Sequence, residues 1–384
     1  FTLDFKKPFG MVLDAFSKPS SIPLFVMPEK VAQTDPFKQI TDMTGSGPYM
    51  FAADRYRPGE KVVYLKNPYY VPRNEPADGT AGGKHVYVDE LDWVILRDAQ
   101  TVANAIEKGE VDVVEMVPNE QYSVLKKNPD IQLLNQTGKQ SAMLHLNHAI
   151  PPFNNPKIAQ AALMAINQAA LQRAQIVHKE LWNTCTSIYP CGSLYASDKT
   201  DYFTGKPQFK RAQELLKEAG YDGTPVVLML PADMPSLNKY PPVMAELLRR
   251  AGFKVDLQSM DWATLVTRRT KSSPVSEGGW NGFITFWNQA DTFNPLFFAP
   301  LTGSGLKGWF GWTDDPKLEA LKDEFVGTSD LAKRKELAEG IQLRVMDSGV
   351  YGMLGEAKPI IALRKNISGL VEAPISVFWG LKKD

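Results

Sequence analysis

The residues with the clearest chemical potential are a single acid surrounded by aromatic rings. Asp291 lies in a segment, 283–298, that also contains six aromatic residues: Phe283, Phe286, Trp287, Phe293, Phe297 and Phe298. A carboxylate among rings is costly to desolvate unless a cation meets it. If this segment lines a cleft, Asp291 anchors an ammonium group and Trp287 supplies a flat apolar wall or a cation–π face. The alternative is that Asp291 caps the turn at 292–295 and that the rings belong to the core.

The two cysteines, Cys185 and Cys191, lie in a loop-like run without helical periodicity. We predict a disulfide between them, because two cysteines this close in a loop suit an exported protein. Closure of so short a ring contributes about 2 kcal/mol. Two independent buried thiols are the first alternative. A second alternative uses Cys185 as a nucleophile with His178 as its base, but no third group that would position this pair is evident.

Other catalytic and metal-binding patterns are missing from the sequence. It contains no glycine-rich dinucleotide or phosphate loop, no His-Glu-x-x-His and no Gly-x-Ser-x-Gly. His145 and His148 are the one close histidine pair, but residues three apart on a strand point to opposite faces, which disfavours a shared metal. The alternative is a hydrogen-bonded histidine near a domain crossing. We therefore predict no enzyme activity, no metal and no cofactor.

The composition is that of a globular protein without a nucleic-acid-binding charge. The 384 residues are 43% hydrophobic and 22% charged, and 43 basic side chains balance 43 acidic ones. A net charge of zero provides no basic field for phosphate backbones, so nucleic acid is not an expected partner. No run supplies the roughly 20 apolar residues that a bilayer span needs. The chain begins with Phe1, so any export signal is expected upstream of it.

The elements that position these residues follow an α/β pattern with short connections. Asp98 is placed to cap a helix that runs through Lys108 and ends at Gly109. The Pro151–Pro152 dipeptide breaks regular structure, and a helix is expected from Asn155 to about Ala174. A second α/β region follows. Its strand at 280–287 leads directly into the segment that carries Asp291.

Several short motifs together resemble family 5 extracytoplasmic solute-binding proteins, the oligopeptide, dipeptide and nickel type that serve ABC importers. These motifs lie at 45–49 (GSGPY), 65–70 (LKNPYY), 105–112 (AIEKGEVD), 146–147 (LN) before 151–153 (PPF), 212–221, 261–262 (DW) and 287–291 (WNQAD). Each motif is weak alone. Their order and spacing over nearly the whole chain make the combined match specific.

The resemblance implies a two-lobed, mixed α/β fold of the periplasmic-binding-protein type (type II, cluster C). Lobe crossings are expected near 145–151 and 354–359. Lobe 1 would then comprise 41–149 with a return at 355–384, lobe 2 would comprise 150–354, and 1–40 would be the remnant of an additional lobe 1 subdomain. Family members begin with further segments, so the resemblance also implies that an amino-terminal part is absent here.

The resemblance also assigns roles to individual residues. The family's acid that pairs with a peptide amino terminus falls on Asp291, with Trp287 beside it. Asn288, Phe293 and His145 complete the expected ligand-binding set together with Glu356. Glu356 lies at the second crossing, where it either favours a basic group of the solute or is solvated hinge surface; we favour the solvated surface.

The expected function is the substrate-binding component of an ABC importer. It would bind a peptide or similar small amine-bearing solute by lobe closure and deliver it to the permease subunits in the membrane. We expect a periplasmic monomer. The alternatives are a hydrolase with its nucleophile in the 185–193 loop, at Cys185 or Ser193, and a binding protein that feeds a chemoreceptor.

Overall fold

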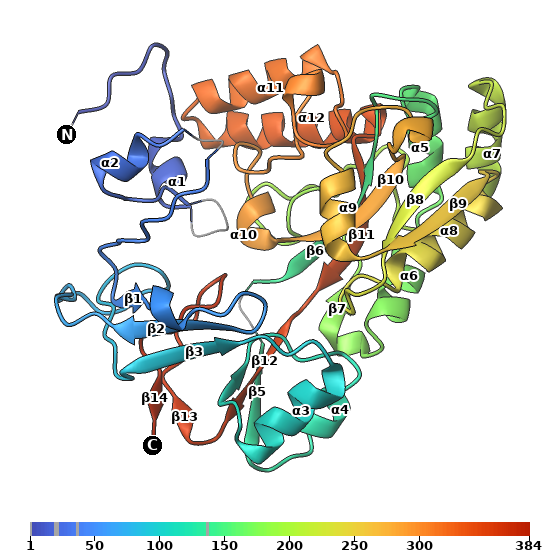
Figure 1. Ribbon diagram of the computed structural model, residues 1–384. Coiled ribbons are helices and arrows are strands. Elements are labelled where there is room, and N and C mark those ends of the chain that lie inside the picture. Colours follow the sequence, from blue (N-terminus) through green and yellow to red (C-terminus); the bar gives the residue numbers. More distant parts are fainter. Residues whose placement is uncertain (1, 19–22, 36–37, 136–137) are drawn as a thin grey trace. The chain divides into compact units, whose positions relative to one another are not determined.

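The computed structural model describes residues 2–18, 23–35, 38–135 and 138–384 (Figure 1). These residues form two compact units. The larger unit contains 2–15 and 139–358, and the smaller unit contains the described residues of 16–138 and 359–384.

The first boundary between the units differs from the expected lobe crossing, and the second does not. The chain changes unit between Gly138 and Lys139, upstream of the expected crossing at 145–151, and between Lys358 and Pro359, within the expected crossing at 354–359. The physical reason is strand pairing, since the strand 140–146 pairs along its whole length with a strand of the larger unit. Residues 2–15 also belong to the larger unit, although we expected all of 1–40 to go with lobe 1.

The larger unit is built on a six-stranded mixed sheet. Its order is β7 (Trp182–Asn183), β11 (Tyr351–Ala357), β6 (Gln140–Leu146), β10 (Gly282–Asn288), β8 (Val226–Pro231) and β9 (Val255–Met260). β6 pairs antiparallel with both β10 and β11, whereas β8 pairs parallel with β9 and β10. β6, β10 and β11 therefore lie side by side and bring together residues more than 200 positions apart.

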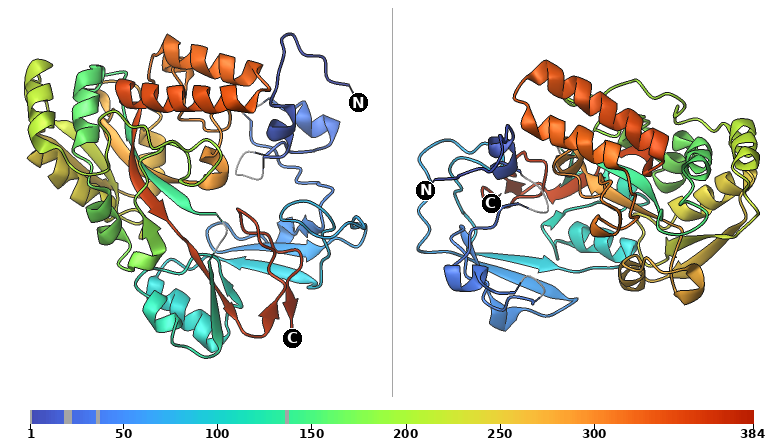
Figure 2. Two further views of the ribbon diagram at one scale, coloured as in Figure 1. Left: turned by 180° about the vertical axis from the view of Figure 1, so that it is seen from behind. Right: turned by 90° about the horizontal axis from the view of Figure 1, so that it is seen from above.

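Helices pack around this sheet, as the views in Figures 1 and 2 show. They are α5 (Pro156–Met164), α6 (Gln168–Gln175), α7 (Phe209–Glu218), α8 (Tyr240–Arg250), α9 (Trp262–Arg268), α10 (Gln289–Thr292), α11 (Pro316–Gly327) and α12 (Leu331–Ser348). Three short 3-10 turns, at Lys179–Leu181, Val275–Glu277 and Gly305–Lys307, join them. α1 (Val12–Phe16) spans the junction of the two units. The main core of this unit includes Leu144, Leu146 and Phe325, which are fully buried.

Local capping explains where several of these helices begin and end. Asn155 caps α5 by accepting from the Lys157 amide, as the sequence predicts. The expected single helix to about Ala174 is wrong, because α5 ends at Met164 and Asn167 caps a new helix, α6, by accepting from the Ala170 amide. A capping side chain inside an apolar run thus divided one predicted helix into two.

The smaller unit contains three small sheets and three short helices among its described residues. The first sheet is β1 (Tyr49–Phe51), β2 (Lys61–Lys66) and β3 (Glu90–Val94); the second is β4 (Val113–Val114), β12 (Ile360–Arg364) and β5 (Ile131–Asn135); the third is β13 (Ile367–Ser368) and β14 (Lys382–Lys383). The helices are α2 (Glu29–Ala32), α3 (Ala99–Lys108) and α4 (Tyr122–Leu125), and a 3-10 turn covers Ala53–Arg55. Asp98 caps α3 through the Thr101 amide and Gly109, at φ 77°, ends it, which confirms the prediction for this helix.

The helices in the described part of the chain are not of the kind that crosses a membrane. None of them combines the length and the apolar composition that crossing a bilayer requires.

Candidate ligand-binding surface on the larger unit

Aromatic side chains gather on one face of the central strands of the larger unit. Side chains alternate along a strand, so Phe283 and Trp287 of β10 share a face, and His145 lies directly opposite Phe283 on β6. The His145 ring stacks on Phe283 with centroids 5.0 Å apart, and Trp309 lies 4.8 Å from His145 and 5.5 Å from Trp287. We call these four residues the aromatic cluster. Trp287 and Trp309 are only half-buried, so part of the apolar surface of the cluster is exposed.

A hydrogen bond fixes the orientation of Trp287. Its indole Nε1 donates to Nε2 of His145 over 3.4 Å. Because Nε2 accepts this bond, the imidazole proton is on Nδ1. Burial, assisted by the positive charge of Arg269, lowers the pKa of His145 to about 3. The ring is therefore neutral at physiological pH. His145 thus supports Trp287 from within the core.

Acid is expected to destabilise the larger unit through His145. The pKa of His145 lies below its unfolded value of 6.5, so the neutral ring stabilises the fold above about pH 6.5 and this contribution is lost as the pH falls toward 3. We expect the free energy of unfolding of the wild type, obtained from urea titrations, to fall between about pH 7 and pH 5 by up to roughly 1.4 kcal/mol per pH unit. His145→Gln should show a shallower decline, while His85→Gln, at an exposed site of the smaller unit, should follow the wild type. Equal slopes for wild type and His145→Gln would contradict this role.

Asp291 lies where β10 turns into the short helix α10. Asp291 is 3% exposed and belongs to α10, four residues after Trp287. Asn288 occupies the cap position of α10, and its Oδ1 accepts from Gln140 Nε2 over 3.3 Å. In the turn that follows, Asn294 Oδ1 accepts from the Leu296 amide over 2.9 Å. Asparagine side chains therefore flank the buried acid: Asn288 at the N-cap position, without a capping bond of its own, and Asn294 in the turn that follows the C-cap residue Phe293.

Glu356 is fully buried, so our preferred interpretation of it as solvated hinge surface is wrong. Its carboxylate accepts from the Cys191 amide over 2.8 Å and from Gln289 Nε2 over 3.0 Å, and it pairs with Lys139 Nζ at 3.2 Å. These three donors satisfy a charge that would otherwise be costly to bury.

A bulge in β11 places Glu356 in this position. The register against β6 shifts between Met353 and Gly355, and Gly355 adopts a φ of 105°. A Cβ at Gly355 would lie 2.8 Å from Gln172 Nε2 and 2.9 Å from the Asn183 carbonyl oxygen, so glycine is required there.

The cysteine loop is closed and anchored to the same carboxylate. Cys185 and Cys191 form a disulfide with their Cα atoms 5.8 Å apart. Gln168 holds the other end of the loop, because its Oε1 accepts from the Cys185 amide over 2.9 Å. The Cys185 sulfur is thus no thiolate nucleophile in this structure. Ser193 Oγ is buried and has no hydrogen-bond partner among the described residues, so no base is in contact with it.

The histidine pair and the cysteines do not form a metal site in the described residues. The one group of three potential ligands found there is Cys185, Cys191 and Glu356, and both sulfurs are used in the disulfide. His148 lies past the end of β6, with its Nε2 3.4 Å from the Val350 carbonyl oxygen.

Some of the predicted site residues contact one another in the structure, and others do not. Trp287 and His145 are in direct contact, and Asn288 and Glu356 are linked to their neighbours through Gln140 and Gln289. Phe293 instead packs its ring on Phe297, at 5.5 Å. Sequence reasoning missed Lys139, Gln140, Gln289 and Trp309. Nothing in the glycine-rich sequence around Trp309 predicted a role for this residue, because its contacts come from strands that are distant in the sequence.

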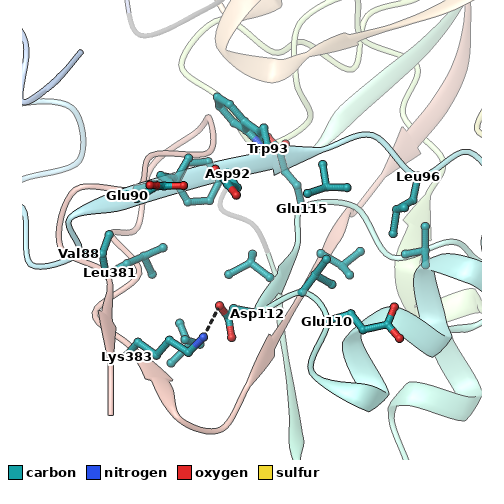
Figure 3. A pocket seen from close by; sticks show the side chains of 18 of the residues that line it. Val88, Glu90, Asp92, Trp93, Leu96, Glu110, Asp112, Glu115, Leu381 and Lys383 are labelled. Atoms are coloured by element: carbon teal, nitrogen blue, oxygen red, sulfur yellow. Dashed lines mark hydrogen bonds and ion pairs between the residues drawn. The ribbon is translucent and has the colours of Figure 1, made fainter. Parts of the chain in front are cut away.

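A separate cavity of about 620 Å³ lies within the smaller unit. It is bounded by β3, by the segment around β4 and by the carboxyl-terminal residues (Figure 3). Its lining includes Glu90, Asp92, Glu110, Asp112 and Glu115, and Lys383 pairs with Asp112 at 2.9 Å. None of the predicted site residues lines it.

The fold is that of the two-lobed solute-binding proteins. The chain belongs to family 5 of these proteins, because residues 1–309 match the family described as bacterial extracellular solute-binding proteins, family 5 Middle. It is 34% identical over its whole length to a probable peptide ABC transporter periplasmic-binding protein of Sinorhizobium fredii and covers 72% of that protein. It is 25% identical over 88% of its length to heme-binding protein A of Haemophilus influenzae and covers 60% of it.

Solved structures share the fold at lower sequence identity. The dipeptide-binding protein of Pseudoalteromonas sp. SM9913, in complex with Met-Leu, matches 88% of the chain with a TM-score of 0.72 and 23% identity. DppA of Helicobacter pylori, in complex with the peptide STSA, matches 88% with a TM-score of 0.72 and 20% identity. The chain spans 64% and 63% of these two proteins. Their similarity supports the two-lobed fold.

Proposed function

We propose that this chain is the solute-binding component of an ABC importer and that it binds a peptide or similar small amine-bearing solute. The observation that carries the proposal is the buried acid Asp291, which lies in α10 four residues after the half-buried Trp287 of β10. A buried carboxylate next to apolar surface suits a ligand ammonium group, which can pair with the acid while its carbon atoms contact the rings. The named specificity of the Sinorhizobium relative for peptides supports this class of solute.

The other proposed site residues either contact the solute or hold the contacting residues in place. Trp287, Asn288 and Phe293 are half-buried and are proposed to contact the solute. His145 and Glu356 are buried, and each hydrogen-bonds to a residue of the segment 287–289. We propose that these two residues hold that segment in place for binding, and that Glu356 does so through Gln289.

The cellular setting follows from the same proposal. A family of extracellular solute-binding proteins works outside the cytoplasm, and the names of the relatives point to the periplasm. The protein is proposed to act there as a monomer that closes its two units on the solute and delivers it to the permease subunits of the transporter.

Native mass spectrometry tests this function. The purified protein is mixed with a pool of di- and tripeptides, and 1:1 complexes are expected with peptides that have a free amino group. The same samples, followed over time, should show intact peptide. Hydrolysis that stops in a Ser193→Ala variant would favour the hydrolase, and the lack of any peptide complex would contradict the proposed function.

A further inference from the structure

The loop that contains the disulfide is held unevenly along its length. Its first part, 185–189, makes several hydrogen bonds to helices of the larger unit. The Cys185 amide donates to Gln168 Oε1 over 2.9 Å, and the Ser187 hydroxyl donates to Gln342 Oε1 over 2.7 Å. The Tyr189 hydroxyl donates to a backbone carbonyl of α12 over 3.1 Å. None of these bonds uses a sulfur atom, so they can persist when the disulfide is opened.

The second part of the loop, 190–194, has fewer connections. In the described part of the chain, it is joined to more distant residues by the disulfide at Cys191 and by the Cys191 amide, which donates to Glu356 Oε1 over 2.8 Å. Its other hydrogen bonds there are local, from the Ser193 amide to the Pro190 carbonyl oxygen and from the Ala196 amide to the Ser193 carbonyl oxygen. The disulfide is therefore the main restraint that keeps the Cys191 amide at Glu356.

Glu356 connects this loop to the proposed binding segment. The same oxygen, Oε1, accepts from the Cys191 amide and from Gln289 Nε2, which lies 3.0 Å away. Gln289 is the first residue of α10, its amide donates to the Lys139 carbonyl oxygen over 2.9 Å, and Asp291 follows two residues later. A buried carboxylate that loses one donor turns toward the donors that remain or toward water. Either movement shifts Gln289 and the helix that begins there.

We propose that the Cys185–Cys191 disulfide is a positioning element for peptide binding, so that its reduction by a dithiol weakens binding of the solute amine at the segment 287–291. This inference rests on the proposed function and adds a redox dependence to it. The effect is local, because the first part of the loop keeps its hydrogen bonds while the Cys191 amide is released from Glu356.

The reduction is an ordinary thiol–disulfide exchange. Cys191 is half-buried whereas Cys185 is 3% exposed, so a thiolate of the dithiol attacks the Cys191 sulfur. The S–S bond breaks, Cys185 leaves as a thiolate that takes up a proton, and a mixed disulfide forms at Cys191. The second thiol of the dithiol then displaces Cys191 as a thiol. In sum the dithiol loses two electrons and becomes a cyclic disulfide, and the protein disulfide becomes two thiols.

Isothermal titration calorimetry of the oxidised and reduced protein tests the inference. The wild type is reduced with dithiothreitol, kept free of oxygen, and its two thiols are confirmed by titration. The probes are the dipeptide Met-Leu and its N-acetyl derivative. Reduction should weaken binding of Met-Leu by about three- to tenfold, the loss associated with one hydrogen bond, and binding of N-acetyl Met-Leu by less than about twofold. Reoxidation should restore the original affinity.

Two variants separate an effect through Glu356 from a general loosening of the fold. The double variant Cys185→Ser with Cys191→Ser should bind Met-Leu like the reduced wild type and should not respond to dithiothreitol. Gln289→Ala removes the side chain that connects α10 to Glu356, so reduction should change its affinity for Met-Leu by less than about twofold.

Equal affinities of the oxidised and reduced wild type for Met-Leu would overturn the inference. It would also be overturned by equal losses for the two probes, or by the same loss on reduction in Gln289→Ala as in the wild type, because each would indicate general loosening. Failure of the reoxidised protein to regain its affinity would contradict a local effect. If the oxidised wild type binds neither peptide, the proposed peptide-binding function is contradicted, and the inference with it.

Discussion

Replacing Asp291 by alanine is expected to weaken binding of the free-amino dipeptide Met-Leu by roughly 30- to 1,000-fold, while binding of N-acetyl Met-Leu changes less than about threefold. The large loss follows from burial, because Asp291 is 3% exposed and a desolvated charge pair loses about 2–4 kcal/mol when one partner is removed. The acetylated form has no ammonium group, so it cannot use the carboxylate in either protein. Calorimetric titration of both peptides against both proteins measures this difference.

Two further variants separate a binding defect from a folding defect. Asp291→Asn keeps the size and the acceptor oxygen but removes the charge, and should retain the fold with most of the binding loss. Asp323→Ala removes an exposed acid of the same unit and should bind both peptides like the wild type. Equal losses for the free and acetylated peptides in Asp291→Ala would exclude Asp291 from contact with the amine.

Replacing Glu356 by alanine is expected to lower the free energy of unfolding of the larger unit by about 3–5 kcal/mol. The carboxylate is fully buried and holds Lys139, Gln289 and the Cys191 amide, so its removal leaves three donors without their acceptor. Differential scanning calorimetry should show the transition of the larger unit at a clearly lower temperature. The transition of the smaller unit should move little.

The size of this effect should depend on burial. Glu356→Gln keeps an acceptor for two of the three donors but loses the charge, and is expected to fall between wild type and alanine. Glu214→Ala disrupts an exposed ion pair with Arg211 and should cost less than about 1 kcal/mol. A loss of similar size in Glu356→Ala and Glu214→Ala would mean that the buried network contributes little stability.

Local signals in the sequence were sufficient for many elements. Asp98 and Gly109 bound α3 as expected, because a cap and a left-handed glycine act within one turn of chain. The same reasoning failed for the helix beginning at Asn155, where the capping by Asn167 is equally local but lies inside an apolar run. The unit boundary near 138/139 was also displaced, since it is set by the pairing of β6 with β10, which lies far away in the sequence.

The candidate site was only partly accessible from the sequence. The aromatic segment around Asp291 is contiguous and could be recognised directly. The burial of Glu356 and the contacts of Trp309 depend on the register of β6, β10 and β11 and on loops that fold back onto these strands. Sequence periodicity contains no information about such long-range pairing, so these residues could be found only in the structure.

A crystal structure of the protein with bound Met-Leu tests the central claim most directly. We predict that the peptide amine lies within hydrogen-bond distance of the Asp291 carboxylate and that the peptide contacts the indole of Trp287. A peptide bound elsewhere, for example in the cavity lined by Asp92 and Asp112, or bound with its amine turned away from Asp291, would contradict the account.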